Sequence, residues 1–191
     1  MNFTFSEKIE PVQDNHVKIQ TVGYDVFNYL DGLSIGDTVD PVKIKSEDRK
    51  LRDGYGQTVL HHVVRIGDLT IVKSLLDNSN LYTLDENGVS LLHVAAGYNQ
   101  LKIFSELLLR TDQEKKLEFF QLKTIGNGHN ILHFAAKYGH VEMINLISTE
   151  SKRLGIDLIE SMDIFNRTPL ALAADLDRSE AGDATNKFIS S

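Results

Sequence analysis

Histidines are the residues in this sequence whose type most suggests metal chemistry. Imidazole nitrogens are common zinc ligands, and every nitrogen ligand of one zinc ion lies about 2.0–2.1 Å from it. His61, His93 and His133 take one equivalent position in separate copies of a repeated pattern, so neighbouring copies should lie on the order of 10 Å apart, the spacing of packed helices. The sequence has no cysteine and no His-Glu-x-x-His motif. We therefore expect no metal ion, and we interpret these rings as structural groups that bond to the backbone of a neighbouring turn.

Other patterns that could support catalysis or cofactor binding are incomplete. No serine lies in a Gly-x-Ser-x-Gly elbow, and Ser90 is explained as a helix cap. The stretch Gly126-Asn127-Gly128 lacks the Gly-Lys-Ser/Thr ending of a phosphate-binding loop. The acidic residues of one connection are typical of a solvated helix face; they are Asp112, Glu114 and Glu118. We predict no catalytic residue and no cofactor.

Composition narrows the class of protein. The chain has 191 residues, of which 41% are hydrophobic, enough for a core. Its formal charge of −7 argues against nucleic-acid binding, which depends on cationic side chains. No apolar run approaches the roughly 18–20 residues that span a bilayer, and the N-terminus lacks the apolar segment of a secretory signal. We expect a soluble, cytoplasmic and monomeric protein that binds neither nucleic acid nor membranes.

A pattern of turn, short helix, tight reversal and longer helix recurs from Asp53 onward. Its equivalent leucines are separated by 32, 40 and 38 residues, a period typical of solenoid proteins. These leucines are Leu60, Leu92, Leu132 and Leu170. The recurrence predicts stacked helix pairs that bury a continuous core.

Differences between the copies preserve physical roles. The residue before each first helix comes from the group that caps helix N-termini; the four are Thr58, Ser90, Asn130 and Thr168. The turn position carries Gly56, Gly88, Gly128 and Asn166, and the helix-ending position carries Gly67, Asn99, Gly139 and Asp177. Glycine, asparagine and aspartate tolerate a positive φ better than other residues. The sequence therefore predicts a positive φ at all of these turn and helix-ending positions.

These copies resemble the ankyrin repeat, whose period is about 33 residues and whose first helix begins with Thr-Pro-Leu-His. Thr168-Pro169-Leu170 and residues 92–96 and 132–140 carry the resemblance, which covers residues 53 to about 176. It implies an all-α solenoid of antiparallel helix pairs, with turns that project to one side and a concave face that binds another protein. We assign residues 53–84, 85–124 and 125–162 to repeats, and residues 163–191 to a partial fourth repeat.

Residues 1–52 precede the recognisable repeats as a divergent N-terminal cap or a degenerate first repeat. Phe3-Thr4-Phe5 and residues 17–22 alternate as short strands do. Residues 24–30 predict a helix that places Val26, Phe27 and Leu30 on one face and stops at residues 31–32. The mixed charges of residues 42–52 are typical of a solvated surface.

The sequence also departs from the ankyrin pattern in its connections and at the end of its fourth copy. The connections 109–124 and 148–162 are longer than the family's usual connection and partly amphipathic, so we expect extended second helices or additional short helices there. Beyond Asp177 the fourth copy lacks the Leu/Ile/Val face of the other second helices. This composition fits either a polar cap or a boundary within a longer protein.

Residues that the stacking pattern does not require are the candidates for contact with a partner. They lie at the turn tips and at the ends of the inner helices, and exposed aromatic and arginine residues there fit the composition of interface hot spots. The turn-tip candidates are Tyr55, Gln57, Asn87, Val89, Asn127, His129, Phe165 and Arg167, and the helix-end candidates are Arg65, Tyr98, Lys137 and Tyr138.

The resemblance therefore predicts a non-enzymatic protein–protein interaction module that acts as a scaffold. One alternative is a regulatory or substrate-targeting region of a larger enzyme. Another is an adaptor in which residues 1–50 recruit a second partner. The lengthened connections are also similar to those of ankyrin proteins that intracellular bacteria deliver into host cells, which would place the protein in the host cytosol.

Overall fold

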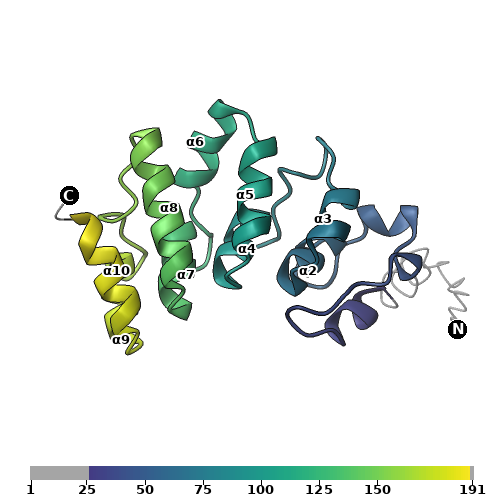
Figure 1. Ribbon diagram of the computed structural model, residues 1–191, viewed down its shortest axis with the longest axis horizontal. Helices are drawn as coiled ribbons and strands as arrows, with labels where there is room; N and C mark the ends of the chain where they lie inside the picture. The colour runs from purple at the N-terminus through teal and green to yellow at the C-terminus, as the bar shows by residue number, and fades with distance from the viewer. Residues whose placement is uncertain (1–25, 190–191) are drawn as a thin grey trace, which may run out of the picture.

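The computed structural model describes residues 26–189, with side chains as far as residue 186. Its helices stand side by side in chain order, from the N-terminal element (purple in Figure 1) to the last helix (yellow). No strand occurs in the described residues, where two isolated β-bridges join Arg52 to Thr58 and Leu84 to Ser90. The architecture is therefore the predicted all-α solenoid. The two expected strands, residues 3–5 and 17–22, lie outside the described residues.

The described chain begins with a helix over residues 26–31, followed by the 3-10 helices η1 (Pro41–Lys43) and η2 (Ser46–Lys50). Helix pairs then form repeats 1 to 4 (Figure 1). The pairs are α2 (Val59–Ile66) with α3 (Leu69–Leu75), α4 (Leu91–Gly97) with α5 (Leu101–Arg110), α7 (Ile131–Tyr138) with α8 (Val141–Leu154), and α9 (Pro169–Asp175) with α10 (Ser179–Ile189). Helix α6 (Gln113–Gln121) lies between the second and third pairs.

The helix boundaries follow from the residue types at the caps. Each inner helix is preceded by its predicted N-cap residue in extended conformation. The predicted turn and helix-ending residues all have positive φ, including the three that are not glycine, which are Asn99 at 54°, Asn166 at 58° and Asp177 at 54°. Pro169 occupies the first position of α9, where a missing N–H breaks no helical hydrogen bond. Both sets of predictions are confirmed.

The N-terminal element packs against repeat 1. Val26, Phe27 and Leu30 are buried, as the predicted helix requires. The following segment is tied to the reversal between α2 and α3, because Gly36 N–H donates to the Ile66 carbonyl at 2.7 Å and Val39 N–H donates to Asp68 Oδ2 at 2.9 Å. The lysines and arginines of residues 42–52 are exposed, as predicted for a solvated surface, but Asp48 is buried and accepts the Lys45 N–H at 2.9 Å.

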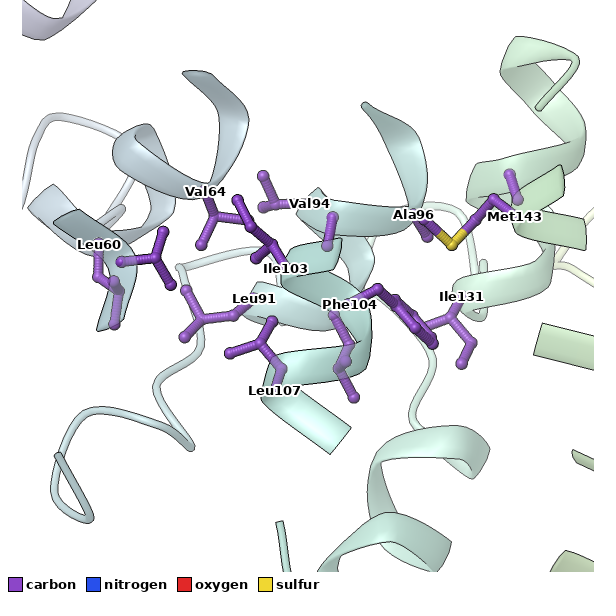
Figure 2. Close-up of a cluster of buried hydrophobic side chains, with 14 of the residues drawn as sticks. Leu60, Val64, Leu91, Val94, Ala96, Ile103, Phe104, Leu107, Ile131 and Met143 are labelled. Carbon is purple, nitrogen blue, oxygen red and sulfur yellow. The ribbon is translucent and has the colours of Figure 1, made fainter. Parts of the chain in front are cut away.

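One apolar core runs through the repeats. Figure 2 shows it as an unbroken row of side chains from Leu60 and Val64, through Leu91 and Phe104, to Met143. Each repeat buries its apolar face against the next one, so no repeat has a complete core of its own. Leu132, which the repeat pattern places between α7 and its neighbours, is completely buried.

The two long connections fold differently. The sequence allowed either an extended second helix or an additional short helix in each, and the structure contains one of each kind. The first forms the additional helix α6, whose Phe119 and Phe120 are buried. Tyr82 stacks on Phe119 with ring centroids 5.7 Å apart and so joins α6 to the preceding loop. The second connection lengthens α8 to 14 residues, after which Leu158 is buried.

Repeat 4 contains both of its helices, although the sequence suggested an unfinished unit. Helix α10 packs on α8 and α9. Among its residues as far as Asn186, the buried ones are Ala181, Gly182, Ala184 and Thr185, and the Thr185 hydroxyl donates to the Ala181 carbonyl at 2.8 Å. Small side chains let the helix approach closely without an aliphatic face, which is why the apolar pattern gave no signal.

Leu132→Ala should lower the free energy of unfolding by about 2–5 kcal/mol, because it leaves a cavity at a completely buried site. Urea unfolding followed by circular dichroism measures the change. Leu109→Ala is the matched control, since Leu109 is 79% exposed and its truncation should be nearly neutral. Equal effects of the two substitutions would contradict the packing described above.

Candidate functional site

The candidate surface is built on the turns that precede the inner helices. We call residues 53–57, 85–89, 124–129 and 163–167 turns 1 to 4. A carboxylate organises three of them in the same way. In turn 1, Asp53 Oδ1 accepts the N–H groups of Tyr55 and Gln57 at 2.8 and 2.9 Å. Asp85 and Asp163 repeat this arrangement in turns 2 and 4, so the turn tips are held in a fixed shape.

Neighbouring turns are also joined by their backbones. The N–H of Glu86 donates to the Tyr55 carbonyl at 3.1 Å. Turns 2 and 3 are joined by the corresponding bond from Ile125 to Asn87 at 2.8 Å, and turns 3 and 4 by the bond from Ile164 to Asn127 at 3.0 Å. The tips therefore form one continuous row in fixed register.

Turn 3 differs from the alignment that the sequence suggested. The alignment placed Ile125 at the position of the turn aspartates, but Thr124 takes that role. Its N–H donates to the His129 carbonyl at 2.9 Å, and its hydroxyl accepts the His129 N–H at 3.1 Å. Turn 3 is therefore one residue longer than the others, and the third repeat begins before residue 125.

The repeated histidines link each inner helix to the next turn, as predicted, in two of three copies. His61 Nδ1 accepts the Thr58 N–H at 3.2 Å, so Nε2 carries the proton and donates to the Val89 carbonyl at 3.2 Å. His133 makes the same pair of contacts, with its Nε2 3.0 Å from the Arg167 carbonyl. His93 Nε2 has no hydrogen-bond partner. Against the larger effect of burial, the backbone groups of His129 and Leu122 nevertheless raise the pKa of His93.

These rings are neutral because of their burial. Burial lowers the pKa of His61 and of His133 to about 4, and that of His93 to about 3. The hydrogen bonds that Nε2 donates only partly offset this effect in His61 and His133. A protonated Nδ1 would also be unable to accept the N–H of the helix cap. The histidine rings therefore act as uncharged hydrogen-bonding groups. To bind a metal ion, they would have to move out of these buried positions.

The prediction that His129 is an exposed turn-tip contact is wrong. Its side chain is buried, stacks on His133 with ring centroids 5.2 Å apart, and places Nε2 3.3 Å from Asp163 Oδ2. Burial lowers the pKa of His129, and Asp163 opposes that effect. His129 therefore packs between repeats 3 and 4, where it contacts Asp163 as Gln57 contacts Asp85 in the first turn.

Asp163 carries the charge at that junction. Burial raises its pKa, but hydrogen bonds from the backbone and the guanidinium of Arg167 outweigh burial and bring the pKa to about 2. The Arg167 guanidinium lies 2.9 Å from Asp163 Oδ2 and 5.0 Å from the centre of the Phe165 ring. Phe165 is thus displayed on an ordered turn.

The predicted aromatic contacts differ in exposure. Tyr55 and Phe165 are 70% and 60% exposed, whereas Tyr98 and Tyr138 are 40% and 48% exposed. Tyr138 also stacks on His140 at 6.0 Å and lies under the Lys137 ammonium at 5.2 Å. Tyr55 and Phe165 are therefore the rings that packing uses least.

The remaining candidates fall into two groups, exposed and half-buried. Asn87 and Asn127 are exposed at the tips, whereas Val89 and Lys137 are half-buried. The other half-buried candidates have internal partners: Gln57 donates to Asp85 at 3.3 Å, Arg65 lies 3.1 Å from Asp31, and Arg167 pairs with Asp163. These three act mainly in holding the surface together.

Two apolar residues of the surface were missed by the sequence reasoning. Ile125 and Ile164 are 75% and 59% exposed on turns 3 and 4. A side-chain atom of Ile164 lies 3.0 Å from where a Cβ on Gly128 would stand, and one of Ile125 lies 3.5 Å from the same point on Gly88. Each is the second residue of its turn, and the equivalent residues of turns 1 and 2 are Gly54 and Glu86, so the repeated pattern gave no signal for an apolar residue there.

A buried imidazole also fastens the N-terminal element to repeat 1. His62 Nδ1 lies 3.0 Å from Asp31 Oδ1, and its Nε2 lies 2.9 Å from Asp53 Oδ2. The Arg65 guanidinium lies 3.1 Å from the same oxygen of Asp31. Since Asp53 also shapes turn 1, this cluster fixes the first tip to the N-terminal element.

Comparison with protein-family models identifies the class of protein. A model of ankyrin repeats in three copies matches residues 35–118, and a model of the single ankyrin repeat matches residues 127–151. The chain therefore belongs to the ankyrin-repeat proteins, whose fold is a non-catalytic one that typically binds other proteins. No curated protein sequence matches the chain. The resemblance to proteins delivered into host cells stays a prediction.

Two further observations concern the described residues. None of their helices is long and apolar enough to cross a bilayer. No cluster of three or more histidine, aspartate or glutamate side chains among them is arranged to hold a metal ion.

The free energy of unfolding should fall as the pH is lowered from 6.5 to 5. In this range the unfolded histidines, with a pKa near 6.5, bind protons, whereas folded His61, His93 and His133 remain neutral. Each ring should contribute up to about 1.4 kcal/mol per pH unit. Urea unfolding at pH 7, 6 and 5 measures the slope, and carboxyl groups with lowered pKa add to it only nearer pH 4.

His133→Gln is the comparison for this experiment, since glutamine can still donate to the Arg167 carbonyl but does not titrate. The slope of its free energy of unfolding against pH should be smaller by the contribution of one histidine. A stability that does not change between pH 7 and 5 in the wild-type protein would contradict the burial of neutral rings.

Proposed function

We propose that this protein binds a partner protein through the turn tips and the exposed ends of its inner helices. The observation that carries the proposal is the display of Tyr55 and Phe165, which are 70% and 60% exposed on turns that hydrogen bonds hold in place. Large rings left outside the packing on a rigid support suit an interface, because they lose little conformational entropy on binding.

The rest of the molecule supports this division of roles. The aliphatic residues of the inner helices pack in the core. The turn aspartates and the repeated histidines form hydrogen bonds within and between the turns. A targeting region of a larger enzyme would use the same surface, and so would an adaptor, so both alternatives share the contact residues proposed here. Tyr98 and Tyr138 extend the surface toward the helix ends.

Site-specific crosslinking tests the location of the partner. A photoreactive phenylalanine analogue placed at Tyr55 or Phe165 should crosslink to a partner protein in extracts of the source cells. The same analogue at Leu109, which is 79% exposed on the outer helix α5, is the control. Crosslinks from Leu109 alone would place the interface on the outer helices and refute the proposal.

Replacing Tyr55 and Phe165 together by serine should weaken binding of the crosslinked partner by at least about 2 kcal/mol, the size expected of hot-spot residues. The melting temperature should change little, because neither ring is buried. Isothermal titration calorimetry measures the affinity, with Leu109→Ser as the control for a lost exposed apolar group. An unchanged affinity in the double variant would exclude the two rings from the interface.

A further inference from the structure

The ring of His62 lies between two carboxylates where the N-terminal element meets repeat 1. Its Nδ1 is 3.0 Å from Asp31 Oδ1, and its Nε2 is 2.9 Å from Asp53 Oδ2. Only 5% of the His62 side chain is exposed, so little water reaches the ring. A neutral imidazole has one N–H group and one lone pair, whereas the imidazolium ion has two N–H groups. The state of the two carboxylates therefore decides which form of the ring fits.

Each carboxylate also accepts hydrogen bonds from other donors. Asp53 Oδ1 accepts the N–H groups of Tyr55 and Gln57, which leaves Oδ2 for the ring. The Arg65 guanidinium lies 3.1 Å from Asp31 Oδ1. Such hydrogen bonds favour the ionised form of a carboxylate, which only accepts. A neutral ring would direct its lone pair at one of these oxygens, so the geometry fits an imidazolium that donates from both nitrogens.

The charges of this cluster balance when the ring is protonated. His62 and Arg65 then carry two positive charges against the two negative charges of Asp31 and Asp53. The Phe27 ring covers the imidazole at a centroid distance of 5.1 Å. The other titratable groups on the N-terminal helix, η2, α2, α3 and α4 make no hydrogen bond or ion pair with His62; apart from the exposed charges of η2, they are Tyr29, Asp48, His61, Asp68, Lys73 and His93.

We propose that His62 is a proton-dependent switch between the N-terminal element and repeat 1. With the ring protonated, His62 joins Asp31 of the N-terminal helix to Asp53 of turn 1. Loss of the proton leaves a lone pair facing a carboxylate oxygen and an unbalanced negative charge at a buried ring, which is costly. The N-terminal element then loosens from repeat 1. This switch does not depend on where a partner binds.

The switch has the opposite sign to the pH dependence of the neutral rings described above. Docking of the N-terminal element keeps a proton on His62, so docking should weaken as the pH rises above 6.5, where a solvated histidine loses its proton. Below pH 6.5 the ring is protonated in both the docked and the released state and adds no slope. Acid therefore weakens the contacts between repeats and leaves the His62 contact intact.

Nitrogen-15 magnetic resonance of the histidine rings reports the charge of His62 directly. At pH 7.5 a solvated histidine, with a pKa near 6.5, is about 90% neutral. His62 should show two protonated ring nitrogens at this pH, and its signals are assigned by their absence in His62→Gln. One protonated and one unprotonated nitrogen would overturn the proposal.

Amide hydrogen exchange measures the docking of the N-terminal element. The N–H groups of Gly36 and Val39 donate to the reversal between α2 and α3. Their protection factors, which correct for the intrinsic effect of pH on exchange, should fall by up to about tenfold per pH unit between pH 6.5 and 8.5. The protection factor of Ile164, at the far end of the row of turns, should change little. Constant protection at Gly36 and Val39 over this range would contradict the switch.

Asp31→Asn separates the charge from the docking. The asparagine amide can donate to the ring, so neutral His62 can accept from it and still donate to Asp53. The pH dependence at Gly36 and Val39 should disappear, and their protection at pH 8.5 should at least equal that of the wild type. His140→Gln is the matched control, because the His140 ring contacts the Gly97 carbonyl and no carboxylate among the described residues. It should keep the wild-type pH dependence, and a dependence that persists in Asp31→Asn would overturn the proposal.

Discussion

The structure depends most on the contact between each inner helix and the turn that follows it in the stack. In repeat 1 a single neutral ring makes this contact, because His61 accepts a hydrogen bond from its own helix cap and donates one to the next turn. The ring therefore fixes the spacing between repeats as well as the start of the helix. The same contact recurs at His133, and its incomplete form at His93 coincides with the one turn that has an extra residue. Burial keeps these rings neutral, which makes the contact sensitive to acid.

The residues that stabilise the protein differ from those that are available for binding. Aliphatic side chains of the inner and outer helices form one continuous core (Figure 2). Aspartates shape the turns, and backbone hydrogen bonds join the tips into a row. The exposed rings of Tyr55 and Phe165 stand on this row without contributing to the core. Such a rigid platform can present a binding surface whose side chains change with little effect on the fold.

Most of the fold could be predicted because the repeat signals are local. A capping residue, a glycine or asparagine at positive φ and a leucine at fixed spacing each act within one turn of chain, and all were read correctly. The errors involve longer-range effects. His129 was misplaced because its contacts are with Asp163 of the next repeat and with the ring of His133, and its position in the turn does not reveal them. The packing of helix α10 was not predicted, because its small buried residues, alanine and threonine, pack closely without forming an aliphatic pattern in the sequence. The pairing of His62 with Asp31 joins residues far apart in sequence, and no motif announces it.

The claim that the turns form one hydrogen-bonded row can be tested without any partner. Amide hydrogen exchange, measured by nuclear magnetic resonance at neutral pH, reports on the N–H groups of Glu86, Ile125 and Ile164, which donate across the junctions. Gly54 holds the equivalent position in turn 1, where no preceding turn exists in the described chain to accept its N–H. Slow exchange at the three junction amides and fast exchange at Gly54 are the predicted result. Fast exchange at all four amides would show that the tips move independently, and would contradict the rigid platform.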